Sequence, residues 1–146
     1  MIDPYNLDRF VQAQAEDYDT ALAEIRRGRK RSHWMWYVFP QFAGLGSSTM
    51  SHRYAIESLA ECEAYLRHPL LGPRLQTCSE AVLAIEGRSA SDIFGYPDDM
   101  KLKSSATLFG CVSPNGSVFD RIIDKYFYGQ ADALTLRLVG PHSRPE

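Results

Sequence analysis

A histidine and two tryptophans follow a run of basic residues, and this block could bind an anionic or planar ligand. The run includes Arg29 and Arg31, and His33, Trp34 and Trp36 come directly after it. An arginine presents a fork of N–H donors that matches phosphate oxygens, and an indole provides a flat face for stacking. His33 adds an imidazole beside the two indoles. The alternative interpretation is a basic cap at a helix end, followed by aromatic core residues.

A second group of reactive residue types lies in the segment DDMKLKSSATLF, residues 98–109. Helical spacing places Lys101 one turn before Ser105, with Ser104 on an adjoining face. A desolvated lysine amine can accept a hydroxyl proton, so this pair could form an activated serine nucleophile. Small hydroxyl residues are also typical of a close contact between helices, and that interpretation stays open.

The glycine-rich loop GLGSS, residues 44–48, could offer backbone N–H groups to an anion. We expect a helix containing Tyr54 and Ile56 to follow it. The alternative interpretation of these five residues is a plain turn without a ligand. The predicted pocket for a phosphate-bearing or nucleotide-like ligand is instead lined by the basic run, the tryptophan block and the lysine–serine helix, and the sequence does not fix the identity of the ligand.

Metal and cofactor sites are not predicted. The four histidines share no ligand spacing, and Cys62, Cys78 and Cys111 form no CxxC pair. Each cysteine lies among apolar neighbours in an amphipathic stretch, so we expect three buried free thiols.

Length and composition indicate one ordinary globular domain. Hydrophobic residues make up 45% and charged residues 23% of 146 residues, so we expect residues 1–146 to form one domain with an ordered core at about 7–139. The formal net charge of −2 disfavours nucleic acid as a partner. No apolar run approaches the roughly 20 residues that span a bilayer, and the N-terminus lacks a signal-peptide pattern, so we expect a cytoplasmic protein.

Helices must position these groups. Apolar residues recur at three- and four-residue steps over 7–27, 70–87 and 118–128. Proline and two acids at 97–99 suit the start of a further helix, which should run to about Cys111. Ser58, Ser89 and Asp132 have the spacing of helix N-caps. Residues 32–46 read as a buried turn of helix followed by a tight loop, and Gln14 interrupts the first apolar stripe and indicates a bend. The fold class is therefore predicted to be all-α, with six to eight helices.

Three blocks of the sequence give a family resemblance. They are RGRKRSHWMWYVFPQFAGLGSS, YAIESLAECEAYLRHPLLGPRL and GRSASDIFGYPDDMKLKSSATLF, and they stand in order. The chain from residue 7 to 139 resembles the domain-of-unknown-function family numbered 1810, small bacterial proteins that many genomes label calpastatin. The resemblance implies an all-helical fold without a known cofactor, and it brings no catalytic residues. The calpastatin label implies a protease inhibitor, but such inhibitors are long disordered chains, whereas this composition is globular.

A shorter resemblance suggests chemistry. FVQAQ at 10–14 and EIRR at 24–27 are similar to the start of the NADAR family, helical proteins that act on ADP-ribose derivatives. That family has a glutamate shortly before this block and a lysine after it, where this chain has Asp8 and Ala15.

Three hypotheses follow from the residues and the resemblances together. They are a domain that binds a small anionic molecule, a hydrolase or lyase on an ADP-ribose derivative with Asp8 as its acid, and a protein-interaction module. A common cleft for His33, Lys101 and Ser105 would favour the first two, whereas separate and buried positions would favour the third.

Overall fold

Nine helices make up the regular structure of residues 2–146, the part of the chain that the computed structural model describes. They are α1 (Asp8–Arg26), α2 (Met35–Val38), α3 (Thr49–Arg53), α4 (Leu59–Arg67), α5 (Leu71–Ala84), α6 (Ala90–Phe94), α7 (Asp98–Cys111), α8 (Val118–Phe127) and α9 (Ala133–Val139). The all-α prediction is confirmed.

The count exceeds the predicted six to eight because short helices leave little periodic signal. None of the five residues of α3 is buried, so this helix has no apolar stripe. The helix expected to contain Tyr54 and Ile56 ends before them, at Arg53. Ile56 instead forms an isolated parallel bridge with Phe42, which ties both ends of the glycine-rich loop together.

The predicted N-caps form at the expected serines and aspartate. Side-chain oxygens of Ser58, Ser89 and Asp132 accept the N–H groups of residues 61, 92 and 135, respectively. The Ser89 backbone N–H donates in return to the Asp92 carboxylate, which completes a capping box. Glu61 does not complete one, because its carboxylate accepts the N–H of Glu57 and pairs with Arg9 instead.

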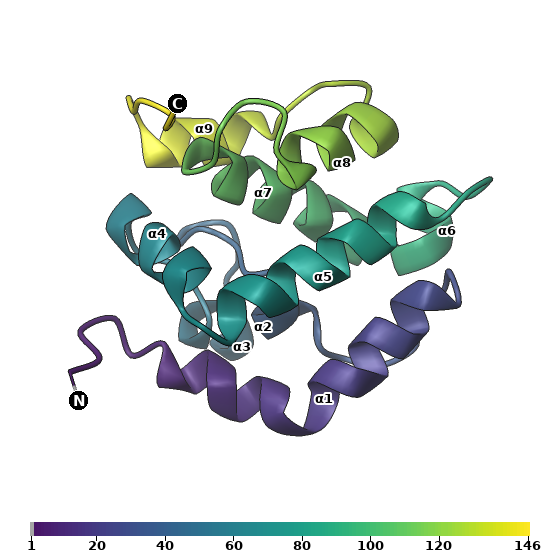
Figure 1. Ribbon diagram of the computed structural model, residues 1–146, viewed down its shortest axis with the longest axis horizontal. Helices are drawn as coiled ribbons and strands as arrows, with labels where there is room; N and C mark the ends of the chain where they lie inside the picture. The colour runs from purple at the N-terminus through teal and green to yellow at the C-terminus, as the bar shows by residue number, and fades with distance from the viewer. Residues whose placement is uncertain (1) are drawn as a thin grey trace.

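Helix α5 crosses the middle of the molecule, with α1 on one side and α7, α8 and α9 on the other (Figure 1). It packs on α1, α4 and α8, and α7 packs on α4, α6, α8 and α9. Figure 1 also shows that α1 is bent. Gln14 is buried in α1, and its amide donates to the Tyr37 carbonyl and the Tyr65 hydroxyl, so the polar residue in the apolar stripe is satisfied.

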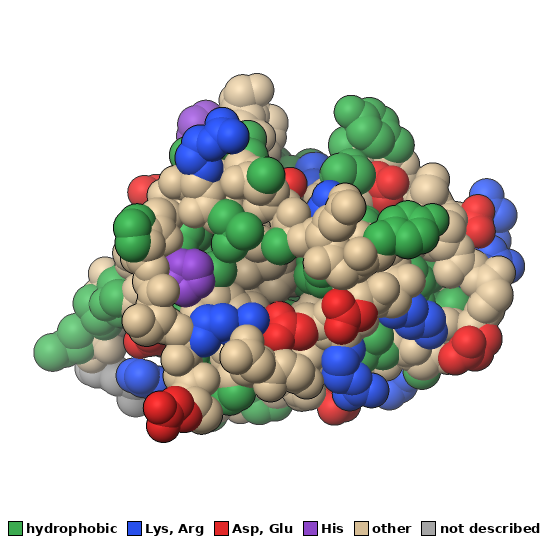
Figure 2. All heavy atoms as spheres, turned by 90° about the horizontal axis from the view of Figure 1, so that it is seen from above, with side chains coloured by type: hydrophobic (Ala, Val, Ile, Leu, Met, Phe, Trp, Pro, Cys, Tyr) green, Lys and Arg blue, Asp and Glu red, His purple; other side chains and the backbone are tan. Residues whose placement is uncertain are grey.

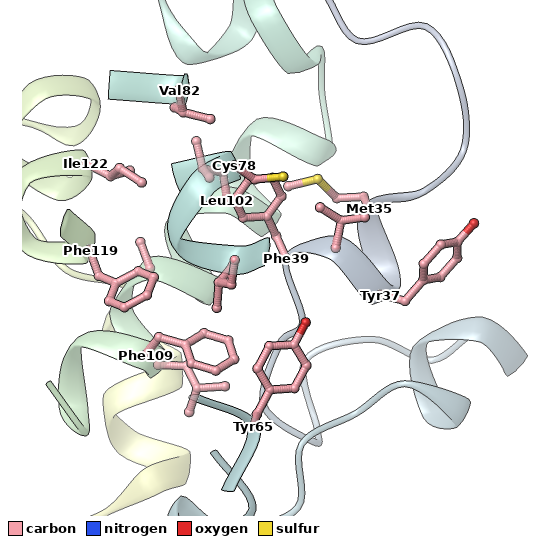
Figure 3. Packing of buried hydrophobic residues seen from close by; sticks show 14 of the residues in the cluster. Met35, Tyr37, Phe39, Tyr65, Cys78, Val82, Leu102, Phe109, Phe119 and Ile122 are labelled. Atoms are coloured by element: carbon pink, nitrogen blue, oxygen red, sulfur yellow. The ribbon is translucent and has the colours of Figure 1, made fainter. Parts of the chain in front are cut away.

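The core lies between these helices and contains the aromatic residues of the α2 segment. Figure 3 shows Met35 and Phe39 from this segment beside Leu102 of α7 and Cys78 of α5. The three cysteines are free and buried, as predicted. Burial raises the pKa of the Cys78 thiol to about 12, so this thiol is protonated at neutral pH. Across residues 2–146, no helix combines the length and the apolar character that crossing a bilayer requires.

Candidate functional site

A buried carboxylate fixes the segment that follows the basic run. Glu24 Oε1 accepts the backbone N–H groups of Arg31 (2.8 Å) and Ser32 (2.9 Å) and the indole N–H of Trp34 (2.8 Å). Its Oε2 accepts the Ser32 hydroxyl at 2.6 Å. Burial opposes ionisation of Glu24, but these hydrogen bonds outweigh it and lower its pKa to about 2. The aromatic block therefore enters the core with a defined orientation.

Two lysines share one carboxylate at the start of α7. Lys30 Nζ lies 2.8 Å from Asp98 Oδ2, and Lys101 Nζ lies 3.4 Å from Asp98 Oδ1. The Lys30 ammonium also lies over the Trp34 ring, and the Lys101 ammonium lies over the Trp36 ring at 4.9 Å from its centroid. One carboxylate between two ammonium groups leaves an excess positive charge in this cluster.

Lys101 lines a hollow between the glycine-rich loop and helices α7 and α9. This hollow has a volume of about 220 Å³, and its polar lining consists of Gln41, Ser51, Lys101, Ser104 and Asp132. A smaller hollow that includes Trp36, His52 and Glu57 adjoins it through Gln41, Gly46 and Ser51. We call the two together the loop hollow.

Residues 44–46 of the glycine-rich loop line the loop hollow. Its ends are fixed by hydrogen bonds from the Ala43 N–H to the Ile56 carbonyl and from the Ile56 N–H to the Gln41 carbonyl, both 2.9 Å. Within residues 2–146, the N–H groups of residues 44–47 have no hydrogen-bond acceptor. A side chain at Gly46 would overlap Ser51, so this close approach requires glycine. Successive free N–H groups in a loop are typical of anion sites.

Three of the eight predicted site residues line the loop hollow. They are Trp36, Lys101 and Ser104, which come from α2 and α7. The hydroxyl of Ser104 donates to the Met100 carbonyl, so it can face a ligand only as an acceptor.

The other five predicted residues lie elsewhere. Trp34 and Ser105 are each only 1% exposed, so neither can touch a ligand in the loop hollow. Arg29, Arg31 and His33 are exposed and do not line it. The structure therefore does not bring the eight residues into one cleft. Glu24 is the physical reason, because it draws the Trp34 indole inward and the backbone of residues 31 and 32 with it.

The proposed lysine–serine pair does not form either. The Lys101 ammonium faces Asp98 and Trp36, whereas Ser105 is buried on α7. Asp8, the acid of the hydrolase hypothesis, is exposed in the first turn of α1 and is not part of the loop hollow. In residues 2–146 no three His, Cys, Asp or Glu side chains come close enough together to hold a metal ion.

Sequence reasoning missed Lys30 as a partner of Asp98, and Gln41 and Ser51 as lining residues. The three-residue step from Asp98 to Lys101 is visible in the sequence and could have indicated their ion pair. Nothing in the sequence links Lys30 to a carboxylate 68 positions later, because that contact depends on how α1 and α7 are placed.

Comparison with known proteins places the whole arrangement in one family. The family model described as "Protein of unknown function (DUF1810)" matches residues 4–139. A solved structure of the conserved hypothetical protein Rv1873 from Mycobacterium tuberculosis is similar to this chain, with 51% sequence identity and a TM-score of 0.92. The similarity covers 94% of this chain and 98% of that one. No match was found among curated proteins. Because the family model covers nearly the full length and the helices superpose, the chain belongs to the DUF1810 family.

Proposed function

We propose that this protein binds a small phosphate-bearing ligand in the loop hollow. The observation that carries the proposal is the position of Lys101 in the same hollow as a loop whose N–H groups have no acceptor within residues 2–146. Backbone N–H groups and an ammonium are the donors that proteins commonly use for phosphate.

The charges around the hollow support one phosphate group rather than several. Lys30 and Lys101 share only the carboxylate of Asp98, so a single added anion would balance them. Asp132 and Glu57 lie at other parts of the lining. Their carboxylates would repel a second phosphate but could accept hydrogen bonds from sugar hydroxyls. This combination fits a sugar phosphate or the ribose phosphate part of a nucleotide-like molecule.

The size of the hollow supports a ligand of this kind. At about 220 Å³, its main part lies below the roughly 300–1,000 Å³ of sites that enclose drug-sized molecules. A phosphate and one sugar ring would fill it, and any base would extend outward, where Leu45, Met100 and Leu134 provide an apolar rim. Figure 2 shows acidic and basic side chains interspersed on one face of the molecule, with no broad basic field of the kind that binds nucleic acid.

The variant Lys101→Gln tests the proposal. We expect it to weaken binding of ribose 5-phosphate or ADP-ribose by about ten- to a hundredfold, the loss typical of a charge-assisted hydrogen bond. Isothermal titration calorimetry with these two compounds and with inorganic phosphate measures the effect. Asp98 keeps Lys30 as its partner in this variant, so the fold should persist.

Lys103→Gln is the matched control, because Lys103 lies two residues along the same helix, over the Phe127 ring and outside the hollow. It should bind like the wild type. Equal losses in both variants would contradict the proposed site. Failure of the wild type to bind any of the three compounds would contradict the proposed function and favour the protein-interaction alternative.

A further inference from the structure

We infer that the protein has a second anion site, which binds a small molecule carrying two or more phosphate groups. It is a hollow of about 550 Å³ at the C-terminal ends of α1 and α5, lined by Arg26, Arg27 and Arg88. We call it the arginine hollow. None of its lining residues belongs to the loop hollow, so this inference stands apart from the proposed function.

The chain brings the three arginines together through a tight approach at Gly28. Arg26 ends α1, Arg27 is its C-cap, and Gly28 turns the chain with a φ of +79°. A Cβ at Gly28 would lie 3.2 Å from Arg88 Cδ, so the absence of a side chain lets Arg88 lie against the helix end. Arg88 comes from the segment before α6, 60 residues after Gly28.

The three guanidinium groups are free to bind. Within residues 2–146, none of them donates a hydrogen bond to a protein acceptor or lies within 4.0 Å of a carboxylate. Arg9 and Arg144 behave differently, because each donates to backbone carbonyls and pairs with an acid. Three guanidinium groups that line one hollow and have no protein acceptor repel one another, and a bound anion would stabilise this arrangement.

The partial negative charges at the C-terminal ends of α1 and α5 do not explain why three arginines gather there. The C-terminal carbonyls of α5 already have a cation, since Lys125 Nζ donates to the carbonyls of Leu83 and Ile85. The end of α1 is closed by backbone hydrogen bonds from Arg27, Gly28 and Arg29. Partial charges at helix ends amount to about half an elementary charge each, which is less than the arginines supply.

The lining also indicates what kind of anion fits. Glu80 and Glu86 line the hollow too, so its charged side chains sum to +1, and Lys125 offsets the partial negative charge at the end of α5. The Glu80 carboxylate accepts from Gln76, and Glu86 lies 3.6 Å from Lys125, so both have other partners. Three guanidinium groups can bind more than one phosphate group. Ala81, Ala84 and Ile85 form an apolar wall for the rest of the ligand. The glutamates disfavour a long nucleic-acid backbone.

Titration with pyrophosphate at low ionic strength tests the inference, using the full chain and calorimetry. We expect Arg88→Gln and Arg26→Gln each to weaken binding about ten- to a hundredfold. Arg121→Gln is the matched control, because Arg121 is exposed on α8 and outside the hollow. Glu80→Gln should strengthen binding several-fold, because it removes a like charge from the lining, and a purely structural role for the arginines would not produce this gain.

The same titration in the Lys101→Gln background separates this site from the loop hollow, and the loss caused by Arg88→Gln should persist there. Circular dichroism establishes that each variant is folded. The inference is overturned if pyrophosphate does not bind, or if Arg88→Gln and Arg121→Gln behave alike. Inorganic phosphate binding as tightly as pyrophosphate, or a single-stranded oligonucleotide displacing pyrophosphate at lower concentration, would overturn the assigned ligand class.

Discussion

Replacing Arg9 with alanine should lower the free energy of unfolding by about 3–5 kcal/mol, the cost of leaving a buried charge without its partner. The Arg9 guanidinium lies 2.8 Å from Glu61 Oε2, and the Glu61 side chain is only 4% exposed. The same guanidinium donates to the carbonyls of Tyr5, Asn6, Arg53 and Ala55. It therefore connects the start of α1 to the segment between α3 and α4. Urea denaturation followed by circular dichroism measures the loss.

Two further variants separate loss of the Arg9–Glu61 ion pair from a general effect of removing an arginine side chain. Arg53→Ala removes an exposed guanidinium that only stacks on the Tyr54 ring, and we expect a change within about 0.5 kcal/mol. The double variant Arg9→Ala, Glu61→Leu removes the orphaned carboxylate as well, and it should be more stable than Arg9→Ala alone. An Arg9→Ala protein within about 1 kcal/mol of the wild type would show that solvent reaches Glu61 readily.

Local signals in the sequence were sufficient to locate most of the helices. Caps at Ser58, Ser89 and Asp132 depend on contacts three residues apart, so sequence spacing alone identifies them. Periodic apolar stripes located α1, α5 and α8, because each of these helices buries one face on its neighbours. The start of α7 was located instead by Pro97 and the two aspartates after it, and this helix is buried on most sides. Helix α3 has no buried residue and gave no such signal.

The sites were harder to predict because long-range contacts decide them. Asp98 meets Lys30, and Gly28 meets Arg88, across at least 60 positions. Sequence reasoning recognised the basic run but chose Arg29 and Arg31, which do not line the arginine hollow, over Arg26 and Arg27, which do. Which arginines of the basic run line a hollow depends on where α1 ends and on the direction in which the next residues turn. Glu24 governs that turn.

Substituting Glu24 with glutamine should destabilise the protein by up to about 3 kcal/mol at neutral pH, which follows from the lowering of its pKa from 4.5 to about 2. Glutamine keeps one acceptor oxygen for the N–H groups of Arg31, Ser32 and Trp34 but loses the negative charge that strengthens these bonds. It also turns an amide toward the Ser32 hydroxyl, where the wild type has an acceptor. Urea denaturation at pH 7 measures the difference.

The pH dependence of the stability difference between the wild type and Glu24→Gln separates loss of the charge from packing damage. Because the pKa of Glu24 is about 2 in the folded state and ordinarily 4.5, the unfolded chain binds more protons between these values, and stability must rise with pH there. The wild type should therefore lose this contribution as the pH falls from about 5 toward 2, while Glu24→Gln has none to lose. The two stability curves should converge in acid and run parallel above pH 5. Glu16→Gln, an exposed change on the same helix, should follow the wild type throughout. Curves that stay parallel from pH 7 to pH 3 would mean that the charge of Glu24 does not hold the aromatic block in place.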